Sequence, residues 1–264
     1  MKTNLRDRLE KYNQALSFYL RPSTFPVAIK MVDDLAMVGP KAKRPQKQLG
    51  INMFLCQAIN ISRRNGWSIY LDKNDISCAS ALFYLGLAKA PEAYWRGEFI
   101  FAPYNQTPQA RARRSKSFPS FPLKKYKGIL MSPLFKADFE PDSVLIYGNP
   151  AQMMRLTQAC VFKTGAPLNF KAQGGGSCSF EVVGPVLTNK VSMVLPGNGE
   201  RIFGHVHDDE MVFAIPFSKM KDFMSYLEQT HKGGQRYPIP QYATFTPELP
   251  SDYVRLLKTV RKGG

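Results

Sequence analysis

The sequence predicts an α+β fold, in which two related strand-helix-strand halves pack as one compact unit with a mixed sheet. The 264 residues are 44% apolar and 12% aromatic, which is typical of a globular protein with a full core. The order strand, helix, glycine, strand, turn, cysteine occurs twice, over about residues 22–100 and 140–230. No composition shift divides residues 1–264, so we expect a single domain.

The N-terminal region predicts a helix followed by a buried strand. Residues 4–20 place leucine and tyrosine side chains at helical spacing, and Pro22 ends the helix. The run FPVAIKMV predicts a strand that begins after Pro26. The Pro-containing segment GPKAKRPQKQ that follows is expected to be a basic loop.

The first half continues with a helix, a strand and a second helix. Residues 52–66 have helical spacing, with Gly66 as a candidate C-cap. WSIYL at 67–71 alternates as a strand does. Cys78 then opens the apolar run CASALFYLGLAKA, which is too short to cross a bilayer and is typical of a core helix.

The second half repeats this order. SVLIYG at 143–148 predicts a buried strand, and Pro150 suits the first turn of the next helix. PLNFKA at 167–172 has the composition of a strand. The turn QGGGSC places Cys178 after this segment, as Cys78 is placed in the first half.

The remaining segments flank these halves. Residues 101–127 are rich in Pro, Ser, Arg and Lys and predict a long basic surface segment. Two strands are expected at 191–197 and 211–217, and a helix begins near Met220. A basic helix is expected at the C-terminal end, after a stretch rich in Pro and Gly.

The charge is strongly positive and unevenly distributed. The net charge is +16, and no acidic residue lies between Glu98 and Asp138. A second basic cluster occupies residues 41–47. Such surfaces attract polyanions, anionic lipid head groups or an acidic protein, and a solvated face is the plain alternative. The candidate anion-binding residues are Arg111, Arg113, Arg114, Lys116, Lys124 and Lys125.

Four cysteines are the main candidates for chemistry. The N-terminus mixes charged and apolar residues, unlike a signal peptide, so we expect a cytoplasmic protein whose thiols are free or bind metal. Four thiolates satisfy an iron–sulfur cluster or a tetrahedral zinc ion. We therefore predict metal ligation by Cys56, Cys78, Cys178 and Cys160, with an iron–sulfur cluster as the first cofactor and zinc or haem as alternatives. Burial as ordinary core thiols is the competing interpretation, above all for Cys160.

Two weaker patterns involve other residues. His205 and His207 would share one face of a strand and could bind a metal, although a hydrated turn is the commoner outcome. The glycines of GGGSC could present backbone amides to an anion, although a plain turn is the commoner outcome. No Walker loop or nucleophile elbow is present in the sequence.

The order of several motifs is similar to that of a known family. FPVAIKM, CQAINISRRNGWSIYLDKNDISCASALFYLGL, PDSVLIYGNPAQMMRLTQA, GGGSCSFEVVGP, LPGNGERIF and DEMVFAIP follow one another as in the bacterial and archaeal family of domain of unknown function 169. The resemblance covers roughly residues 12–230 and carries no reaction with it. It implies that Cys56, Cys78 and Cys178 occupy family-type positions, together with the polar site candidates Lys30, Arg201 and Glu210.

The hypothesis that follows is a cytoplasmic iron–sulfur or metal-binding protein that serves redox metabolism, with an acidic redox partner or another polyanion as its partner. A first alternative is a nucleic-acid or polyanion-binding module that uses residues 41–47 and 108–127. A second is a small-molecule or tetrapyrrole-binding protein in which the cysteines pack or supply one axial ligand. The sequence does not decide between an enzyme and a binding protein.

Overall fold

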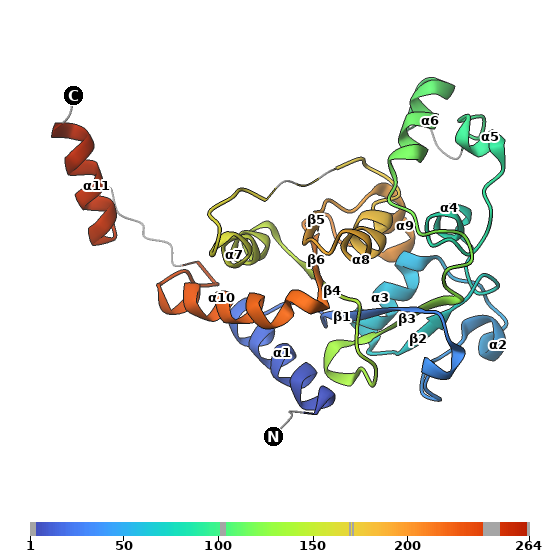
Figure 1. The fold of residues 1–264 in the computed structure, drawn as a ribbon, viewed down its shortest axis with the longest axis horizontal. Coiled ribbons are helices and arrows are strands. Elements are labelled where there is room, and N and C mark those ends of the chain that lie inside the picture. The colour runs from blue at the N-terminus through green and yellow to red at the C-terminus, as the bar shows by residue number, and fades with distance from the viewer. Residues whose placement is uncertain (1–3, 101–103, 169, 171, 240–248, 263–264) are drawn as a thin grey trace.

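The computed structural model describes the chain except residues 1–3, 101–103, 169, 171, 240–248 and 263–264. Its centre is a six-stranded sheet in the order β2-β3-β1-β4-β6-β5 (Figure 1). The strands are β1 (Val27–Val32), β2 (Ile69–Leu71), β3 (Gly128–Pro133), β4 (Ser143–Gly148), β5 (Ser192–Val194) and β6 (Met211–Pro216). The α+β class is confirmed.

Each neighbouring pair of these six strands is antiparallel, so the expected mixed sheet is not formed. The physical reason lies in the strand order. β1 and β2 run in the same direction, but β3 lies between them, and β6 separates β4 from β5 in the same way. The sequence prediction missed β3, which follows the basic segment directly.

One face of the sheet carries the elements that later form the candidate site. These are α3 (Leu55–Asn65), α4 (Ala79–Tyr84), the π-helical turn η3 (Ser179–Val183), α8 (Gly184–Thr188) and α9 (Asn198–Gly204). Alternate strand residues, including Ile29, Leu145 and Ala214, point into this layer because successive side chains of a strand face opposite ways. Gly66 ends α3 with a φ of 74°, as the sequence predicted for its C-cap.

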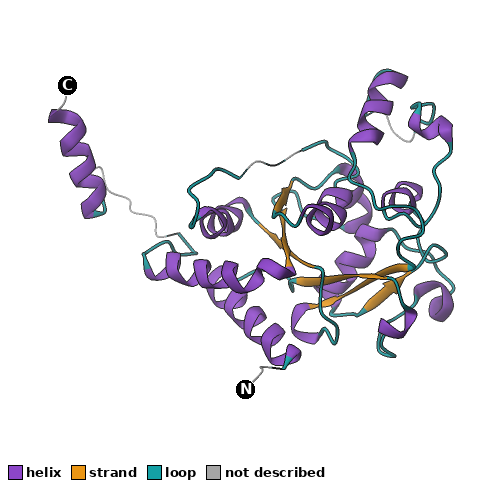
Figure 2. Cartoon of the chain, in the orientation of Figure 1, coloured by secondary structure: helices purple, strands orange, loops and turns teal. Residues whose placement is uncertain are grey.

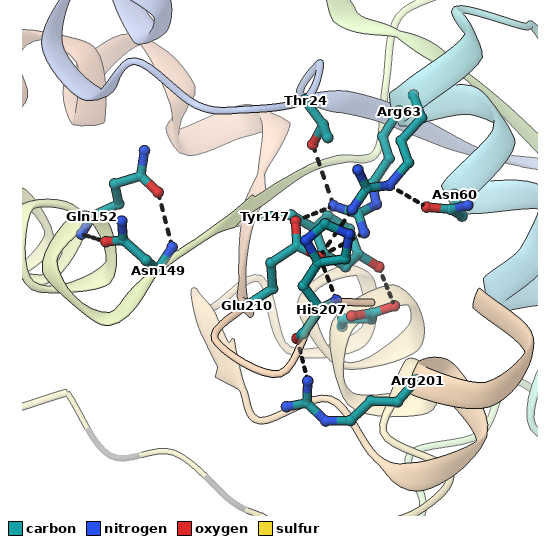
Figure 3. A network of polar contacts seen from close by, with 11 residues as sticks. Thr24, Asn60, Arg63, Tyr147, Asn149, Gln152, Arg201, His207 and Glu210 are labelled. Carbon is teal, nitrogen blue, oxygen red and sulfur yellow. Dashed lines mark hydrogen bonds and ion pairs between the residues drawn. The ribbon is translucent and has the colours of Figure 1, made fainter. Parts of the chain in front are cut away.

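The opposite face packs against α1 (Leu5–Leu20), α7 (Pro150–Val161) and α10 (Met220–Lys232). Strand residues such as Ile146 and Ile215 meet the buried side chains of these helices. α7 begins with a reciprocal cap, in which Asn149 and Gln152 each accept the backbone N–H of the other at 2.8–2.9 Å (Figure 3). The two helical layers therefore bury the sheet on both sides.

Short or outlying elements complete the fold, and Figure 2 distinguishes them from the loops. They are α2 (Pro45–Leu49), α5 (Glu92–Trp95), α6 (Pro108–Ser117), α11 (Ser251–Lys262) and the 3-10 turns η1 (Leu35–Met37), η2 (Leu134–Lys136) and η4 (Phe217–Lys219). α6 lies within the expected basic surface segment. The described residues of the expected strand 167–172 have no regular structure, and residues 169 and 171 lie outside the described part of the chain.

The strand order is symmetric about the centre of the sheet. Counted inward from one edge the strands are β2, β3 and β1, and from the other edge they are β5, β6 and β4, so that β1, β2 and β3 correspond to β4, β5 and β6. In this matching α3 corresponds to η3 and α8, because both lie on the same face between the first and second matched strands. Cys56 and Cys178 then correspond, since each stands at the start of its helical segment. The sequence analysis instead matched Cys178 with Cys78. The relation between the two halves stays a prediction.

Within the described chain, none of the helices combines the length and the apolar character that a membrane span requires.

Candidate functional site

Three of the four cysteines line one cavity of about 410 Å³ on the α3–α9 side of the sheet. Cys56 lies in the first turn of α3, Cys78 directly precedes α4, and Cys178 directly precedes η3. The other lining residues are Phe54, Ser77, Ala79, Ser80, Tyr84, Tyr104, Arg114, Phe118, Gly175, Gly176, Gly199, Glu200 and Phe203. The fold thus collects thiols from three separate segments at one place.

Each of these thiols is held by a different neighbour. The Cys178 sulfur and the Tyr84 hydroxyl are 2.7 Å apart, and the Cys56 thiol donates to the Gly199 carbonyl at 3.8 Å. Burial raises the pKa of all three thiols, and the nearby Glu200 carboxyl raises the pKa of Cys56 and Cys178 further. For Cys78 the backbone amides of Ser80 and Ala81 oppose this rise. Burial therefore favours the neutral form of all three thiols.

Two neighbouring carboxyl groups are buried beside the cavity, and one of them, Glu200, lines it. Glu181 on η3 is fully buried, and Glu200 on α9 is 3% exposed. Glu200 Oε2 accepts the backbone N–H of Gly197 at 2.8 Å, and Glu181 Oε1 accepts the Tyr147 hydroxyl at 3.2 Å. Burial raises the pKa of both carboxyls, and the neighbouring Glu200 raises that of Glu181 further, whereas Ser177, the Gly197 amide and Glu181 oppose part of the rise at Glu200. The pair consequently keeps a proton that an exposed pair would release.

Tyr147 connects this acidic pair to a buried ion pair. The Arg63 guanidinium lies 4.1 Å from the centre of the Tyr147 ring and makes two hydrogen bonds to Glu210, of 2.6 and 2.8 Å (Figure 3). The His207 backbone N–H also donates to Glu210 at 2.8 Å. Burial alone raises the pKa of Glu210, but these bonds and the charges of Arg63 and Arg64 outweigh it and hold the pKa below its ordinary value.

Aromatic side chains form much of the cavity wall. The rings of Phe54 and Phe203 stack at 4.0 Å with an angle of 5° between their planes. At the other side the Arg114 guanidinium lies 4.8 Å from the centre of the Tyr104 ring and 5.3 Å from that of Phe118. The cavity wall therefore combines aromatic rings with three thiols and the Glu200 carboxyl.

The glycine run 174–176 makes room for this wall. A Cβ atom at Gly175 would lie 2.5 Å from Arg114 Nη2, and one at Gly176 would lie 2.6 Å from the Phe118 ring. Gly176 also has a φ of 68°, which side chains rarely allow. The run is explained by close packing and backbone conformation, as the plain-turn interpretation of GGGSC proposed.

Cys160 lies apart from the other cysteines. It belongs to α7, which covers the opposite face of the sheet. It lines a different cavity of about 580 Å³ together with Lys163, Lys190 and Lys219. The structure therefore brings together three of the predicted ligands and not the fourth.

The polar candidates Lys30, Arg201 and Glu210 do not line the thiol cavity. Lys30 is on the opposite side of β1 and pairs with Asp142 at 2.8 Å. Arg201 on α9 donates to the His207 carbonyl (Figure 3). Glu210 pairs with Arg63, which lies over the Tyr147 ring, and Tyr147 in turn donates to Glu181.

The six basic candidates divide into different roles. Arg111 ties α6 to the preceding loop by donating to the Gly97 and Asn105 carbonyls. Arg114 is the one of the six that lines the thiol cavity. Arg113, Lys116, Lys124 and Lys125 are exposed, and Lys125 lies over the Tyr126 ring. In the second basic cluster, Lys43 and Arg44 lie over the rings of Trp67 and Tyr70.

Sequence reasoning missed the acidic part of the site. Glu181, Glu200, Tyr84 and Tyr147 were not singled out, and neither was Arg63. The available signal was a charged residue in an apolar helical run, because charged side chains in such runs are buried only when they are paired. Glu181 within SFEVVGPV has this pattern, whereas Arg63 lies in the mostly polar run INISRRNG and gives no such signal. In the part of the chain that the structure describes, no group of three or more His, Cys, Asp or Glu side chains is arranged to hold a single metal ion.

Comparison with known proteins identifies the family. The profile of the DUF169 family, described as uncharacterised ArCR, matches residues 15–225. The chain belongs to the DUF169 family. The matched region of this DUF169 protein contains the cavity lined by the three cysteines, the Glu181–Glu200 pair, the Arg63–Glu210 ion pair and the whole sheet. Helix α11 lies outside it. The family assignment that the motifs predicted is confirmed.

A curated relative comes from an archaeon. The DUF169 chain is 26% identical to the uncharacterized protein MJ0308 of Methanocaldococcus jannaschii over 176 residues, which cover 66% of this chain and 75% of that protein. No solved structure gave a significant match. The relative carries no assigned activity in its name, so the site itself must support any function.

Proposed function

We propose that the cavity binds an iron–sulfur cluster through Cys56, Cys78 and Cys178, and that the protein serves redox metabolism. The observation that carries this proposal is the presence of three thiols, from three separate segments, in one cavity of about 410 Å³. Cysteine thiolates are the usual ligands of such clusters. Glu200, which lines the same cavity, is available as a further oxygen ligand or as a partner for the cluster.

The charge balance around the cavity supports a positively charged occupant. The thiols of Cys56 and Cys178 and the carboxyls of Glu181 and Glu200 all hold their protons above their ordinary pKa. Binding of metal ions releases protons from such ligands, because the metal charge compensates the anions that burial disfavours. The buried cation Arg63 is already paired with Glu210.

A cluster suits these thiols better than a single ion. A tetrahedral zinc ion needs its sulfur ligands at one common point, with bonds of about 2.3 Å. A cluster contains several metal ions, and its ligands are correspondingly farther apart. The three thiols line the wall of one cavity rather than converging on a single point. The exposed basic residues Arg113 and Lys116 on α6, near the cavity, suit an acidic redox partner.

The test is anaerobic purification of the full chain, followed by absorption spectroscopy and by iron and sulfide analysis. We expect a broad absorption of the cluster with matching iron and sulfide. The substitutions Cys56→Ser, Cys78→Ser and Cys178→Ser should each remove most of the bound iron, because each removes a ligand.

Cys160→Ser is the matched control, because Cys160 lies on the opposite face of the sheet. It should leave the absorption and the iron content unchanged. A folded, colourless protein without iron would contradict the proposal. Zinc in the metal analysis would indicate a zinc site instead of a cluster, and a Soret band would indicate haem.

A second candidate is a small anionic molecule, and Arg114 is the observation that favours it. Its guanidinium lines the cavity between two aromatic rings, and none of the carboxylates that the structure describes forms an ion pair with it. A carboxylate or phosphate group would pair with Arg114 while an apolar body lay along the rings. Mass spectrometry of the material released from denatured, metal-free protein tests this candidate.

A further inference from the structure

The C-terminal helix α11 is separate from the body of the protein in Figure 1. It covers residues Ser251–Lys262, and none of its residues is buried. The family match ends before it, at residue 225. The helix therefore adds nothing to the core that the rest of the chain forms, and its surface is available to a partner.

The sequence of α11 divides its surface into two opposite faces. At the helical period, Tyr253, Leu256, Leu257 and Val260 fall on one side. Three of these side chains are strongly exposed, with Tyr253 at 51%, Leu256 at 57% and Val260 at 65%. An apolar face of this extent is unfavourable in water, so it indicates a surface that is covered in the working state.

The other face of α11 is basic. Arg255, Lys258 and Lys262 lie opposite the apolar side chains, Arg261 lies at the border, and Asp252 is the single acidic residue of the helix. An apolar face backed by Lys and Arg is the pattern of helices that lie in the interface of a membrane. The apolar side chains enter the acyl boundary, and the basic ones meet anionic head groups.

We propose that α11 binds the surface of membranes that contain anionic lipids and attaches the DUF169 domain to them. The charge of the rest of the chain favours this occupant over the protein's own surface. A cavity beside α10, around Cys160, is lined by Lys163, Lys190 and Lys219 against the single acidic residue Asp222, and this excess of positive charge repels a basic helix. Anionic lipid provides both the apolar medium and the opposite charge.

The basic helix α6 provides a comparison within the same chain. It carries exposed Arg113 and Lys116 but no exposed large apolar side chain. It can attract anions, but it has nothing to insert into a membrane. If α11 is the membrane-binding element, removal of charge from α6 should have little effect.

The experiment is flotation of the full chain with vesicles of phosphatidylcholine alone, or of phosphatidylcholine mixed with phosphatidylglycerol. We expect binding to the mixed vesicles, weak binding to the neutral ones, and a loss of binding as the salt concentration rises. The double substitution Leu256→Glu and Val260→Glu should abolish binding. The control pair Leu49→Glu and Leu187→Glu adds the same charge at exposed leucines elsewhere and should retain most of it.

A second pair of variants separates the two basic helices. Arg255→Gln with Lys258→Gln should weaken binding to mixed vesicles by roughly tenfold to thirtyfold, since each basic residue near the surface contributes about 1 kcal/mol. Arg113→Gln with Lys116→Gln should weaken it much less. The proposal is overturned if the full chain does not bind the mixed vesicles. It is also overturned if the variant with glutamate at 256 and 260 binds as the unmodified chain does, or if the α6 variant loses as much binding as the α11 variant.

Thermal unfolding of each variant, followed by circular dichroism, shows whether the body remains folded. The α11 variants should unfold at the temperature of the unmodified chain, because α11 contributes no buried residue. A soluble acidic protein as the partner would appear as an absence of binding to every vesicle, which counts against the proposal.

Discussion

Two buried polar clusters lie on either side of Tyr147, and they differ in charge balance. On one side Arg63 and Glu210 form a two-pronged ion pair, with a side-chain exposure of 0% and 5%. On the other side Glu181 and Glu200 are two neighbouring acids whose pKa values are both raised by burial. The first cluster satisfies its own charges and stabilises the fold. The second is unbalanced, faces the thiol cavity, and has the character of a binding site.

The largest effect is expected from breaking the balanced cluster. Arg63→Ala should lower the free energy of unfolding by about 3–5 kcal/mol, because it leaves Glu210 buried without its cation. Urea denaturation at neutral pH measures this. Lys30→Ala is the control, since the Lys30–Asp142 pair is partly exposed, and it should cost about 1 kcal/mol or less. Equal costs for the two variants would show that the Arg63 cluster has no special role in stability.

A smaller effect, of opposite sign, is expected in the acidic cluster. Burial raises the pKa of Glu181 above its ordinary value of 4.5, so the folded chain holds a proton that the unfolded chain releases. The stability linked to this proton is complete below pH 4.5 and is lost as the pH rises toward the raised pKa. Glu181→Gln cannot ionise, and it should therefore be more stable than the unmodified chain at pH 7 and about equal to it near pH 4.

Glu210→Gln should show the reverse dependence. The pKa of Glu210 is lowered, so its contribution is present above the ordinary value of 4.5 and is lost as the pH falls through the lowered pKa. This variant should lose stability at pH 7 and lose less in acid. Urea denaturation between pH 4 and pH 7 measures the free energy of unfolding of Glu181→Gln and Glu210→Gln. If this free energy depends on pH in the same way for both variants, the two clusters do not differ as described.

The smallest effect is expected at the residue between the clusters. Tyr147→Phe removes the hydroxyl that donates to Glu181 but keeps the ring beneath Arg63, so it should cost about 1 kcal/mol. Tyr70→Phe removes a similar hydroxyl, which donates to the Lys127 carbonyl at 3.2 Å, and is the matched control. Only Tyr147→Phe should steepen the loss of stability with rising pH, because its hydroxyl stabilises the ionised form of Glu181. An equal pH dependence of the two variants would show that the Tyr147 hydroxyl does not affect the ionisation of Glu181.

Local patterns predicted most of the regular elements. The strand at 143–148, the end of α3 at Gly66 and the start of α7 at Pro150 all follow from residues that are near one another in the chain. β3 was missed because its short apolar run GILM directly follows a basic segment whose composition is typical of a surface loop. The strand expected at 167–172 failed because no neighbouring strand pairs with its described residues.

The site was predicted only in part, and the reason is distance along the chain. Cys56, Cys78 and Cys178 were proposed as ligands from residue type and family resemblance, and they do line one cavity. Cys160 was included because thiol count alone cannot show which face of a sheet a helix covers. Glu200 was missed because a carboxyl on a short helix has the sequence appearance of a surface residue.

The sequence by itself determined many of the regular elements, the excess of positive charge and the two faces of α11, because each depends on residues near one another in the chain. The tertiary structure decided which of the cysteines meet, which carboxyls lose contact with water and which strands become neighbours. These features depend on contacts between segments more than a hundred residues apart, such as Arg63 with Glu210 and Cys56 with Gly199. Burial, which is set by those contacts, is what converts ordinary thiols and carboxyls into a candidate site.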